Sequence, residues 1–492
     1  MKNFFLRFKS LFDKQDFTTG SPTKKILFFF IPIILANLFQ QLYYFTDALI
    51  VGQVLPDHAV AAINASGSIN YIIMNLGLGC ASGFSVIMAK RVGAKDLDRS
   101  KKSFLTQLIL TVIVSITVTI IGIALLRPFL SLMGLTPNDS DYLMNIEYLE
   151  AREYLLYMFS GAIAVIFYNL MFANLRAKGD SFSPFCFLAV GVIANIGLDL
   201  LFVKVLGMGV GGSALATILC QFIASIICFF YARHRYEEFR VSFKEIRLER
   251  KEIFLHLKNG LPLGFQFAIL GFGILAMTAS VVKLDINIDG SLVTGLPAQV
   301  GYGAANKLIN LLITPLASLG VAMLSYIGQN YGAKDYERIK KGIISGVLIG
   351  VVFTIILNII GWLMMINGFY QYVFLSSDKV NEGTLFFGNT YLYISLPSLL
   401  FLMLLFIFRN VSQAMERPLI PFLGGVAELF ARVFMVLILP LLIYSSLSSE
   451  TDISAYYLIA SGDAFSWLLG ALILLIPSLV LVYRLLKKKQ KM

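Results

Sequence analysis

A small set of polar side chains lies within or at the ends of long apolar stretches of this sequence. Asp47 and Asp199 are carboxylates at the ends of two such stretches, and Asn195 precedes Asp199 by four positions. Because residues four apart share a helix face, Asn195 and Asp199 present an amide and a carboxylate on the same side. The hydroxyl of Thr217 lies in the next stretch. Such oxygen atoms are ligands for small hard cations, and closely placed carboxylates can instead retain a proton, so the cluster predicts a site for Na⁺ or H⁺.

The elements that must position these groups are membrane-spanning helices. Hydrophobic residues make up 58% of the 492 positions and charged residues only 14%, a composition that a soluble fold does not accommodate. A helix needs roughly 20 apolar residues to cross a bilayer, and twelve stretches are long enough. They are residues 26–46, 59–89, 104–126, 154–175, 181–198, 205–232, 259–282, 308–333, 342–377, 383–408, 418–444 and 464–483. The sequence therefore predicts an all-α polytopic membrane protein with twelve transmembrane helices.

The other ionisable residues at membrane depth lie in the second half of the chain: Lys307, Glu428, Arg432 and Asp463. Glu428 and Arg432 are four apart, so they are expected to neutralise each other on one helix. Lys307 and Asp463 are candidates for a pair between two helices. For all four, the sequence leaves a functional role and a structural pairing open. Asp47 and Asp199 differ, because no Lys or Arg lies in the predicted spans of their own half.

The net charge of +11 marks membrane topology. With the amino terminus in the cytoplasm, 33 of the 40 Lys and Arg residues fall in cytoplasmic segments. This imbalance predicts that both termini are cytoplasmic, and it argues against nucleic acid as a partner. Phosphate-binding loops and catalytic motifs are absent, so neither an enzyme nor a nucleotide-driven pump is predicted. The four cysteines and three histidines have no spacing typical of a metal site, and no cofactor is expected.

The chain contains an internal repeat. Residues 89–102 (AKRVGAKDLDRSKK) match residues 328–341 (GQNYGAKDYERIKK) at 7 of 14 positions, at an offset of 239. Because each half has six predicted helices, the halves enter the membrane in the same direction and form a parallel repeat of two six-helix bundles. The predicted parts are an interfacial amphipathic segment (1–24), a first bundle (25–232), a cytoplasmic linker (233–252), a second bundle (253–484) and a basic cytoplasmic tail (485–492).

The repeat also serves as a control for the acidic cluster. A second echo, between residues 176–185 and 413–422, has an offset of 237, which places Arg432 opposite Asn195 and Val436 opposite Asp199. The second half has therefore not kept the acidic cluster, and this one-sidedness favours a functional site in the first half. Pro32 lies fifteen residues before Asp47 and is either a kink in the first helix or an ordinary proline near a helix start.

Several segments resemble the multidrug and toxic compound extrusion (MATE) transporters. They are LANLFQQLYYFTDALIVGQVL (35–55), the Gly-Ala-Lys after the second predicted helix, ANIGLDLLF (194–202) and GMGVGGSALAT (207–217). The resemblance implies two six-helix bundles that export amphipathic, often cationic, compounds in exchange for Na⁺ or H⁺. It assigns the cation site to Asp47, Asn195, Asp199 and Thr217, and a helix 1 hinge to Pro32. One branch of the family has an acidic residue in helix 7, where this chain offers only Gln266.

These observations together predict an antiporter of the cell membrane that works by alternating access. Its expected partners are small amphipathic molecules and membrane lipids, its only cofactor is the coupling ion, and it is expected to be a monomer. The alternative is a flippase for a lipid-linked saccharide, a function of distant relatives in the same superfamily. Such flippases often have a strongly cationic central cavity, whereas this sequence places only Lys307 and Arg432 within helices.

Overall fold

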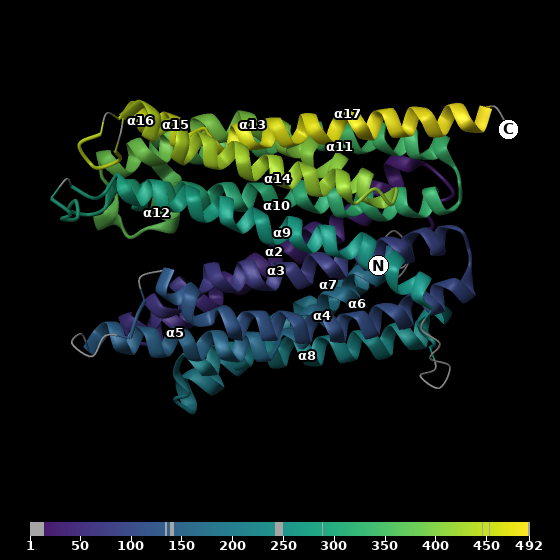
Figure 1. Ribbon diagram of the computed structural model, residues 1–492, viewed down its shortest axis with the longest axis horizontal. Helices are drawn as coiled ribbons and strands as arrows, with labels where there is room; N and C mark the ends of the chain where they lie inside the picture. The colour runs from purple at the N-terminus through teal and green to yellow at the C-terminus, as the bar shows by residue number, and fades with distance from the viewer. Residues whose placement is uncertain are drawn as a thin grey trace, which may run out of the picture. The chain divides into compact units, whose positions relative to one another are not determined.

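The computed structural model shows a protein built of long helices (Figure 1). It describes residues 14–132, 135–137, 142–241, 249–287, 289–444, 446–451 and 453–490. Eleven helical spans in the described ranges are long and apolar enough to cross a membrane, and a bent pair, α5 and α6, makes up the twelfth. The predicted twelve-helix fold is therefore confirmed. The predicted amphipathic segment centred on residues 4–12 lies outside the described residues.

The first six spans come from the predicted first bundle. Pro22 occupies the first position of the first helix, where its missing N–H leaves no hydrogen bond unmade. The fourth span bends by 48° between α5 and α6. In order, the spans are α2 (Pro22–Val54), α3 (Asp57–Gly93), α4 (Leu97–Leu132), α5 (Tyr142–Ser160) with α6 (Ala162–Ala177), α7 (Phe182–Asp199) with the π-helical segment η1 (Leu200–Val205), and α8 (Gly209–Arg235).

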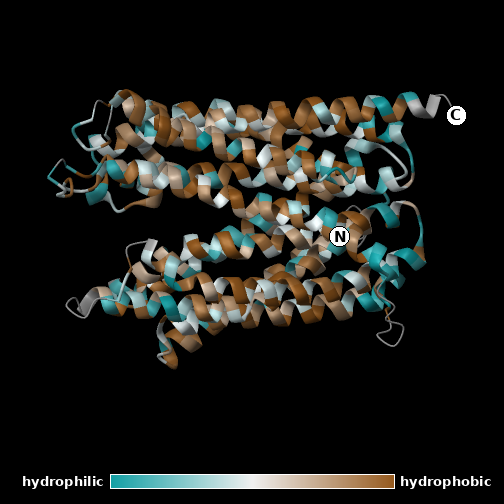
Figure 2. Cartoon of the chain, in the orientation of Figure 1, coloured by the Kyte–Doolittle hydropathy of each residue, from teal (hydrophilic) through white to brown (hydrophobic). Residues whose placement is uncertain are grey.

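The last six spans follow the short 3₁₀ segment η2 (Glu237–Phe239). Figure 2 shows hydrophobic residues along the middle of the helices and hydrophilic ones toward their ends. The spans are α9 (Arg250–Lys283), α10 (Pro297–Gly332), α11 (Tyr336–Met365) with η4 (Ile366–Gly368) and α12 (Phe369–Phe374), α13 (Glu382–Ala414) preceded by η5 (Ser377–Lys379), α14 (Leu419–Val433) with η6 (Phe434–Ile438) and α15 (Leu439–Tyr444), and α16 (Ser454–Ala460) with α17 (Gly462–Gln490).

The chain forms two compact units. Unit 1 comprises residues 1–268 together with two short segments from later in the chain, 324–339 and 413–418, and unit 2 comprises the rest. In unit 1, α3 packs against α4, α5 and α6, while α2 packs against α7 and α7 against α8. In unit 2, α14 packs against α17. The two short segments are the α10–α11 and α13–α14 turns, so parts of the second repeat belong to the first unit.

The two copies of the Gly-Ala-Lys-Asp sequence form the same turn. Lys95 and Lys334 both have a left-handed backbone, with φ of 57° and 58°. Two residues before each lysine is a glycine, Gly93 or Gly332, and each glycine packs closely against the backbone of the other turn within unit 1. A Cβ on Gly93 would collide with the carbonyl of Gln329, and a Cβ on Gly332 would collide with the carbonyl of Lys90. Since Gly93 and Gly332 occupy equivalent repeat positions, the structure gives the sequence repeat a physical reason: each copy needs a glycine to let the other approach.

Replacing Gly93 by Ala is expected to lower the free energy of unfolding by about 1–3 kcal/mol, because the added methyl group overpacks this contact. Gly303→Ala is the matched control, since a Cβ there meets nothing within 4 Å. In that helical position, alanine should be neutral or stabilising. Thermal unfolding of the purified variants measures both effects. Equal unfolding temperatures for Gly93→Ala and Gly303→Ala would contradict the assignment of the close contact.

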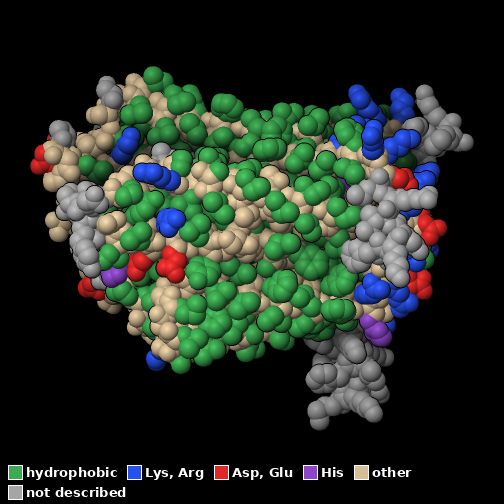
Figure 3. All heavy atoms as spheres, turned by 60° about the horizontal axis from the view of Figure 1, so that its bottom comes forward, with side chains coloured by type: hydrophobic (Ala, Val, Ile, Leu, Met, Phe, Trp, Pro, Cys, Tyr) green, Lys and Arg blue, Asp and Glu red, His purple; other side chains and the backbone are tan. Residues whose placement is uncertain are grey.

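The outer surface of the helices fits a membrane environment. Exposed large hydrophobic side chains occur along the spans, including Ile120, Ile193 and Phe430. In the face shown in Figure 3, hydrophobic side chains cover the middle, while Lys, Arg, Asp and Glu gather toward the two ends. Such a band has to be covered by lipid rather than by water. Which end faces the cytoplasm stays a prediction from the distribution of positive charge.

Candidate functional site

The predicted cation-site residues come together inside unit 1. Asp47 lies in the second half of α2, Asn195 and Asp199 lie in the last turns of α7, and Thr217 lies in α8. The packing of α2 on α7 and of α7 on α8 brings the three helices side by side. Asn195 and Asp199 are buried, with 2% and 1% of their surface exposed. The i, i+4 spacing read from the sequence thus points both side chains into the protein.

Direct contacts connect the acidic and hydroxyl groups. The carboxyl of Asp199 lies close enough to interact with that of Asp47. The Ser213 hydroxyl donates to Asp47 Oδ1 at 3.3 Å, and the hydroxyls of Tyr43 and Thr217 share a hydrogen bond of 2.6 Å. Tyr43 and Ser213 were not predicted from the sequence. Their positions carried a signal, because Tyr43 is one helical turn before Asp47 and Ser213 is one turn before Thr217.

The site contains polar atoms whose hydrogen-bonding capacity is unused. Both carboxylate oxygens of Asp199 and both polar side-chain atoms of Asn195 are buried without a hydrogen-bond partner among the described residues. Each such atom costs about 1–3 kcal/mol if it stays unpaired, so the arrangement favours a bound cation, proton or water. In the described part of the chain, no Lys or Arg forms an ion pair with Asp47 or Asp199.

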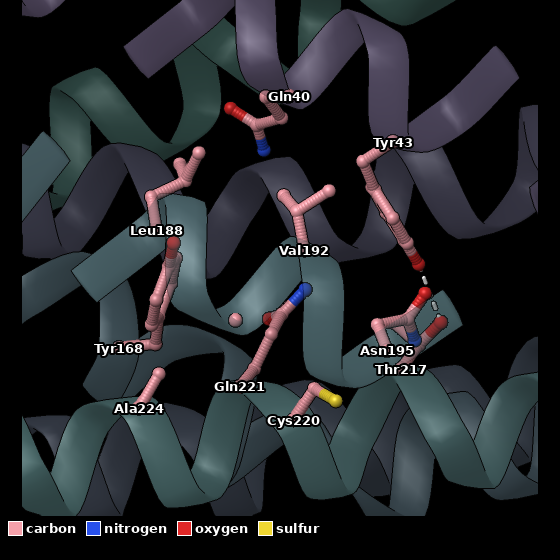
Figure 4. Close-up of a pocket in the computed structure, with 11 residues that line it drawn as sticks. Gln40, Tyr43, Tyr168, Leu188, Val192, Asn195, Thr217, Cys220, Gln221 and Ala224 are labelled. Atoms are coloured by element: carbon pink, nitrogen blue, oxygen red, sulfur yellow. Dashed lines mark hydrogen bonds between the residues drawn. The ribbon is translucent and has the colours of Figure 1, made fainter. Parts of the chain in front are cut away.

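A small cavity adjoins these residues (Figure 4). Its volume is about 40 Å³, and it is lined by α2, α7, α8 and Tyr168 of α6. Asn195, Thr217 and Gln221 supply polar groups to its wall, whereas Leu188 and Val192 supply apolar ones. About three water molecules fit in this volume. The cavity therefore gives water or a small cation room beside Asn195 and Thr217.

The backbone at the site departs from α-helical geometry. Asp199 is the last α-helical residue of α7 and is followed directly by the π-helical segment η1. In the second repeat, the π-helical segment η6 follows Val433 at a nearly equivalent place. Single π-helical turns inside α-helices are rare and occur frequently at functional sites. The backbone irregularity is thus shared by both repeats, but only the first carries the acidic residues.

Pro32 lies in the interior of α2, as the eleventh residue of the helix. The helix continues on both sides of it. The interpretation of Pro32 as an ordinary helix-start proline is therefore wrong, because Pro22 has that position. An interior proline removes one backbone hydrogen bond and weakens the helix locally. A hinge at Pro32 stays a prediction.

The buried charges of unit 2 pair differently from the sequence prediction. Glu428 does not pair with Arg432 on its own helix but with Arg409 of α13, at 2.5 Å. Arg432 pairs with Asp463 at 2.7 Å, and Asp463 also accepts a hydrogen bond of 2.6 Å from Tyr391. The predicted tenth span ended at Phe408 and so left Arg409 in a loop, whereas α13 continues to Ala414. Both acids therefore have basic partners, which distinguishes them from Asp47 and Asp199.

The two remaining polar candidates have no such partners among the described residues. Lys307 is exposed on α10 and Asp463 is held by Arg432, so the candidate pair between Lys307 and Asp463 does not form. Gln266 is fully buried in α9, and neither of its amide atoms has a hydrogen-bond partner in the described ranges. Gln266 has no carboxylate to offer, so a mechanism that needs an acid in this helix has no support here.

Comparison with known proteins decides the family. The MatE family model matches residues 32–201 and 286–438, more than half of the chain. The chain belongs to the MATE family. A probable multidrug resistance protein of Bacillus subtilis, YpnP, is 30% identical over 66% of this chain and 68% of its own length. A relative of this MATE protein in Shewanella oneidensis, described as an FAD transporter, is 23% identical over 64% of this chain and 66% of its own.

Solved structures agree with the fold. A crystal structure of a MATE protein in complex with MaD5 matches 96% of this chain and 99% of its own, with a TM-score of 0.80 at 19% identity. This MATE protein is accordingly a multi-pass protein of the cell membrane and belongs among transporters, not enzymes. The resemblance described above for the sequence is thereby confirmed at the level of family and fold. The roles of individual site residues rest on the geometry of this chain.

Removing the Ser213 hydroxyl is expected to weaken cation binding about fivefold, because the site loses an oxygen atom that lies beside Asp47 and can contact the cation. Ser225→Ala is the matched control, since Ser225 lies on the same helix and donates only to a backbone carbonyl, that of Phe222. The measurement is the dependence of transport rate on Na⁺ concentration or pH. An unchanged ion dependence in Ser213→Ala would remove Ser213 from the site.

Proposed function

We propose that this MATE protein is an antiporter that exports amphipathic organic cations in exchange for Na⁺ or H⁺. The coupling ion binds at Asp47 and Asp199, with Asn195, Thr217 and Ser213 as additional oxygen donors. The observation that carries this proposal is the contrast between the two repeats. In unit 2, Glu428 and Asp463 have arginine partners, whereas Asp47 and Asp199 face each other without one among the described residues. Two neighbouring carboxylates without a basic partner attract a cation, because no other positive charge neutralises them.

Coupling requires that the ion and the substrate favour different conformations. A ligand shifts a conformational equilibrium only by its difference in affinity for the two states. In the proposed cycle, a cation from outside binds Asp47 and Asp199 in the outward-facing state and promotes release of the substrate. Since α2 carries both Asp47 and Pro32, a change of charge at one end of the helix is able to alter its bending at the proline. In the inward-facing state, the cation leaves and a new substrate binds.

The main alternative is transport of an anionic or lipid-linked substrate. The B. subtilis relative is named for multidrug resistance, which supports organic cations and other drugs, whereas the S. oneidensis relative is named for FAD. A flippase for a lipid-linked pyrophosphate needs free positive charge in the membrane. Of Lys307, Arg409 and Arg432, the two arginines are each within an ion pair, which leaves only the exposed Lys307 to supply it. These pairs favour the efflux antiporter.

Transport by purified protein in liposomes tests the proposal. The liposomes are loaded with a fluorescent organic cation, and a Na⁺ gradient or a pH gradient is imposed separately. We expect one of the two gradients to accelerate efflux, and that gradient identifies the coupling ion. FAD and a lipid-linked saccharide are assayed in parallel. Efflux of the organic cation that ignores both gradients would overturn antiport, and transport of only FAD or the lipid would overturn the substrate class.

A further inference from the structure

A short non-helical segment before α2, residues 14–20, is tied down across one end of unit 1 and is called the strap here. Phe17 at its centre is fully buried. The Phe17 ring packs edge-on against Phe29 of α2 at 5.0 Å and against Tyr326 of α10 at 5.5 Å. Its backbone N–H donates to Gln329 Oε1 at 3.2 Å. The strap therefore anchors the start of α2 to the end of α10.

Arg338, at the start of α11, clamps the strap from the other side. Its guanidinium donates to three strap carbonyls: Phe17 at 2.8 Å, Thr19 at 3.0 Å and Gly20 at 2.9 Å. It also donates to Asn330 Oδ1 at 3.1 Å, and Asn330 in turn donates to the Phe17 carbonyl at 3.1 Å. Hydrogen bonds with a charged donor are the stronger ones, and only arginine has a planar fork that reaches several acceptors at once.

The same contacts reach the α6–α7 turn. The Gln15 N–H donates to the carbonyl of Gly179 at 2.8 Å, and Gln329 Nε2 donates to the carbonyl of Ala177 at 2.8 Å. The strap and Gln329 thus join three segments that are far apart in the sequence: the start of α2, the α6–α7 turn and the α10–α11 turn. The α10–α11 turn is part of unit 1, although most of α10 and α11 belongs to unit 2.

The repeat shows that this clamp is not a general requirement of the turn. Arg99 is the counterpart of Arg338 in the first copy of the repeat. The backbone N–H of each arginine caps its helix on an equivalent aspartate, Asp96 or Asp335. The Arg99 side chain, however, is 72% exposed and reaches only its neighbour Asp96 at 3.5 Å. The turn therefore forms with an exposed arginine side chain, and four of the five side-chain hydrogen bonds of Arg338 go to carbonyls of the strap.

A polar cavity lies beside the strap. The cavity has a volume of about 290 Å³ and is lined by both acidic and basic side chains, among them Lys14, Asp16, Lys178 and Glu238. Burial and the neighbouring Lys178 lower the pKa of Lys14. A cavity of this size and polarity holds water, which can replace the hydrogen bonds of the strap when it detaches. The strap is thus held by polar contacts that water can exchange, apart from the one buried Phe17 ring.

We propose that the strap is a latch: Phe17 and Arg338 hold the α10–α11 turn against the first-repeat helices of unit 1, and this contact must break in each transport cycle. Both are positioning residues, because neither lies at the cation site. The latch adjoins α2, the helix that carries Asp47 and Pro32, so release of the strap and movement of α2 are mechanically connected. The expected effect of the latch on transport rate rests on the function proposed above, whereas the contacts of the strap do not.

Alkylation of a reporter cysteine tests the latch without substrate or gradient. Ser100 is fully buried and lines the cavity beside the strap, so Ser100→Cys reports opening there. We expect Arg338→Ala to accelerate its reaction with a water-soluble maleimide about tenfold in purified protein, since several charged hydrogen bonds are lost. Arg99→Ala, the repeat-matched control, should leave the rate unchanged. The native cysteines give a baseline in protein that retains Ser100. Equal rates in Arg338→Ala and Arg99→Ala would overturn the latch.

A second pair of variants separates a latch from a merely structural contact. Phe17→Leu keeps an apolar anchor, whereas Phe17→Ala removes most of it. We expect the alanine variant to raise the alkylation rate severalfold and the leucine variant to restore it, with both eluting as folded protein on gel filtration. In transport, Arg338→Ala should change the maximal rate and shift the apparent ion dependence, because the ion binds only one of the two conformations, whereas Arg99→Ala should change neither. Normal alkylation in Phe17→Ala, or wild-type transport in Arg338→Ala, would contradict the proposal. Because alkylation requires no coupling ion, its outcome is independent of the antiport proposal.

Discussion

Asp199→Asn is expected to reduce gradient-driven transport at least about 100-fold while the protein still folds and binds substrate. The substitution keeps the shape of the side chain but removes one of two uncompensated carboxylates. The remaining Asp47 has no second acid to share a cation or a proton with. Asp47→Asn should have the same effect for the same reason. Transport in liposomes under an imposed gradient, normalised to the amount of folded protein, provides the measurement.

Asp180→Asn is the matched control for this prediction. Asp180 is also a buried aspartate of unit 1, but its carboxylate already accepts hydrogen bonds from the Ser183 N–H and hydroxyl at 2.9 and 2.7 Å and from Tyr236 at 2.8 Å. Its substitution should affect stability more than coupling. If Asp180→Asn uncoupled transport as strongly as Asp199→Asn, the cation site would not be confined to the carboxylate pair of α2 and α7.

Arg432→Leu is expected to destabilise the protein by about 3–5 kcal/mol, the largest stability effect we predict. The cause is the Asp463 carboxylate, which would stay largely buried with its countercharge removed and with the hydrogen bond from Tyr391 as its remaining polar contact among the described residues. Glu428 keeps Arg409, so the second ion pair should survive. The measurement is thermal unfolding of the purified protein in detergent.

The double variant Arg432→Leu with Asp463→Leu shows whether the loss comes from the unpaired charge. Replacing a whole buried ion pair by apolar residues is often neutral or stabilising, so the double variant should unfold at a higher temperature than Arg432→Leu alone. A double variant no more stable than the single one would mean that Arg432 stabilises unit 2 mainly through its packing, for example against Gly273.

The hydrophobic pattern and the internal repeat were sufficient to predict the fold from the sequence. A long apolar stretch predicts each membrane span, and the matching Gly-Ala-Lys-Asp turns identify the two repeats. The physical reason for that match, the reciprocal approach of Gly93 and Gly332, required the structure. The helix ends were less predictable. The span that ended at Phe408 in the sequence continues as α13, because a buried Arg409 paired with Glu428 is compatible with a helix inside the protein.

The sequence predicted those features of the candidate site that depend on residue spacing within one helix. It did not predict those that depend on contacts between helices. The i, i+4 spacing correctly placed Asn195 and Asp199 on one buried face. The same spacing failed for Glu428 and Arg432, because each side chain turns to a different neighbouring helix. Ser213 and Tyr43 were not predicted, because a serine or a tyrosine is common in an apolar helix. Their hydrogen bonds to Asp47 and Thr217 depend on how α2 packs against its neighbouring helices.

Release of the coupling ion upon substrate binding tests the central claim most directly. A fluorescent organic cation is titrated into purified protein, and the Na⁺ or H⁺ set free is recorded with an ion-selective electrode or a pH indicator in weak buffer. We predict that the wild type releases cations as the substrate binds, and that the double variant Asp47→Asn with Asp199→Asn binds the substrate without releasing any. Undiminished release from the double variant would show that Asp47 and Asp199 do not hold the coupling ion.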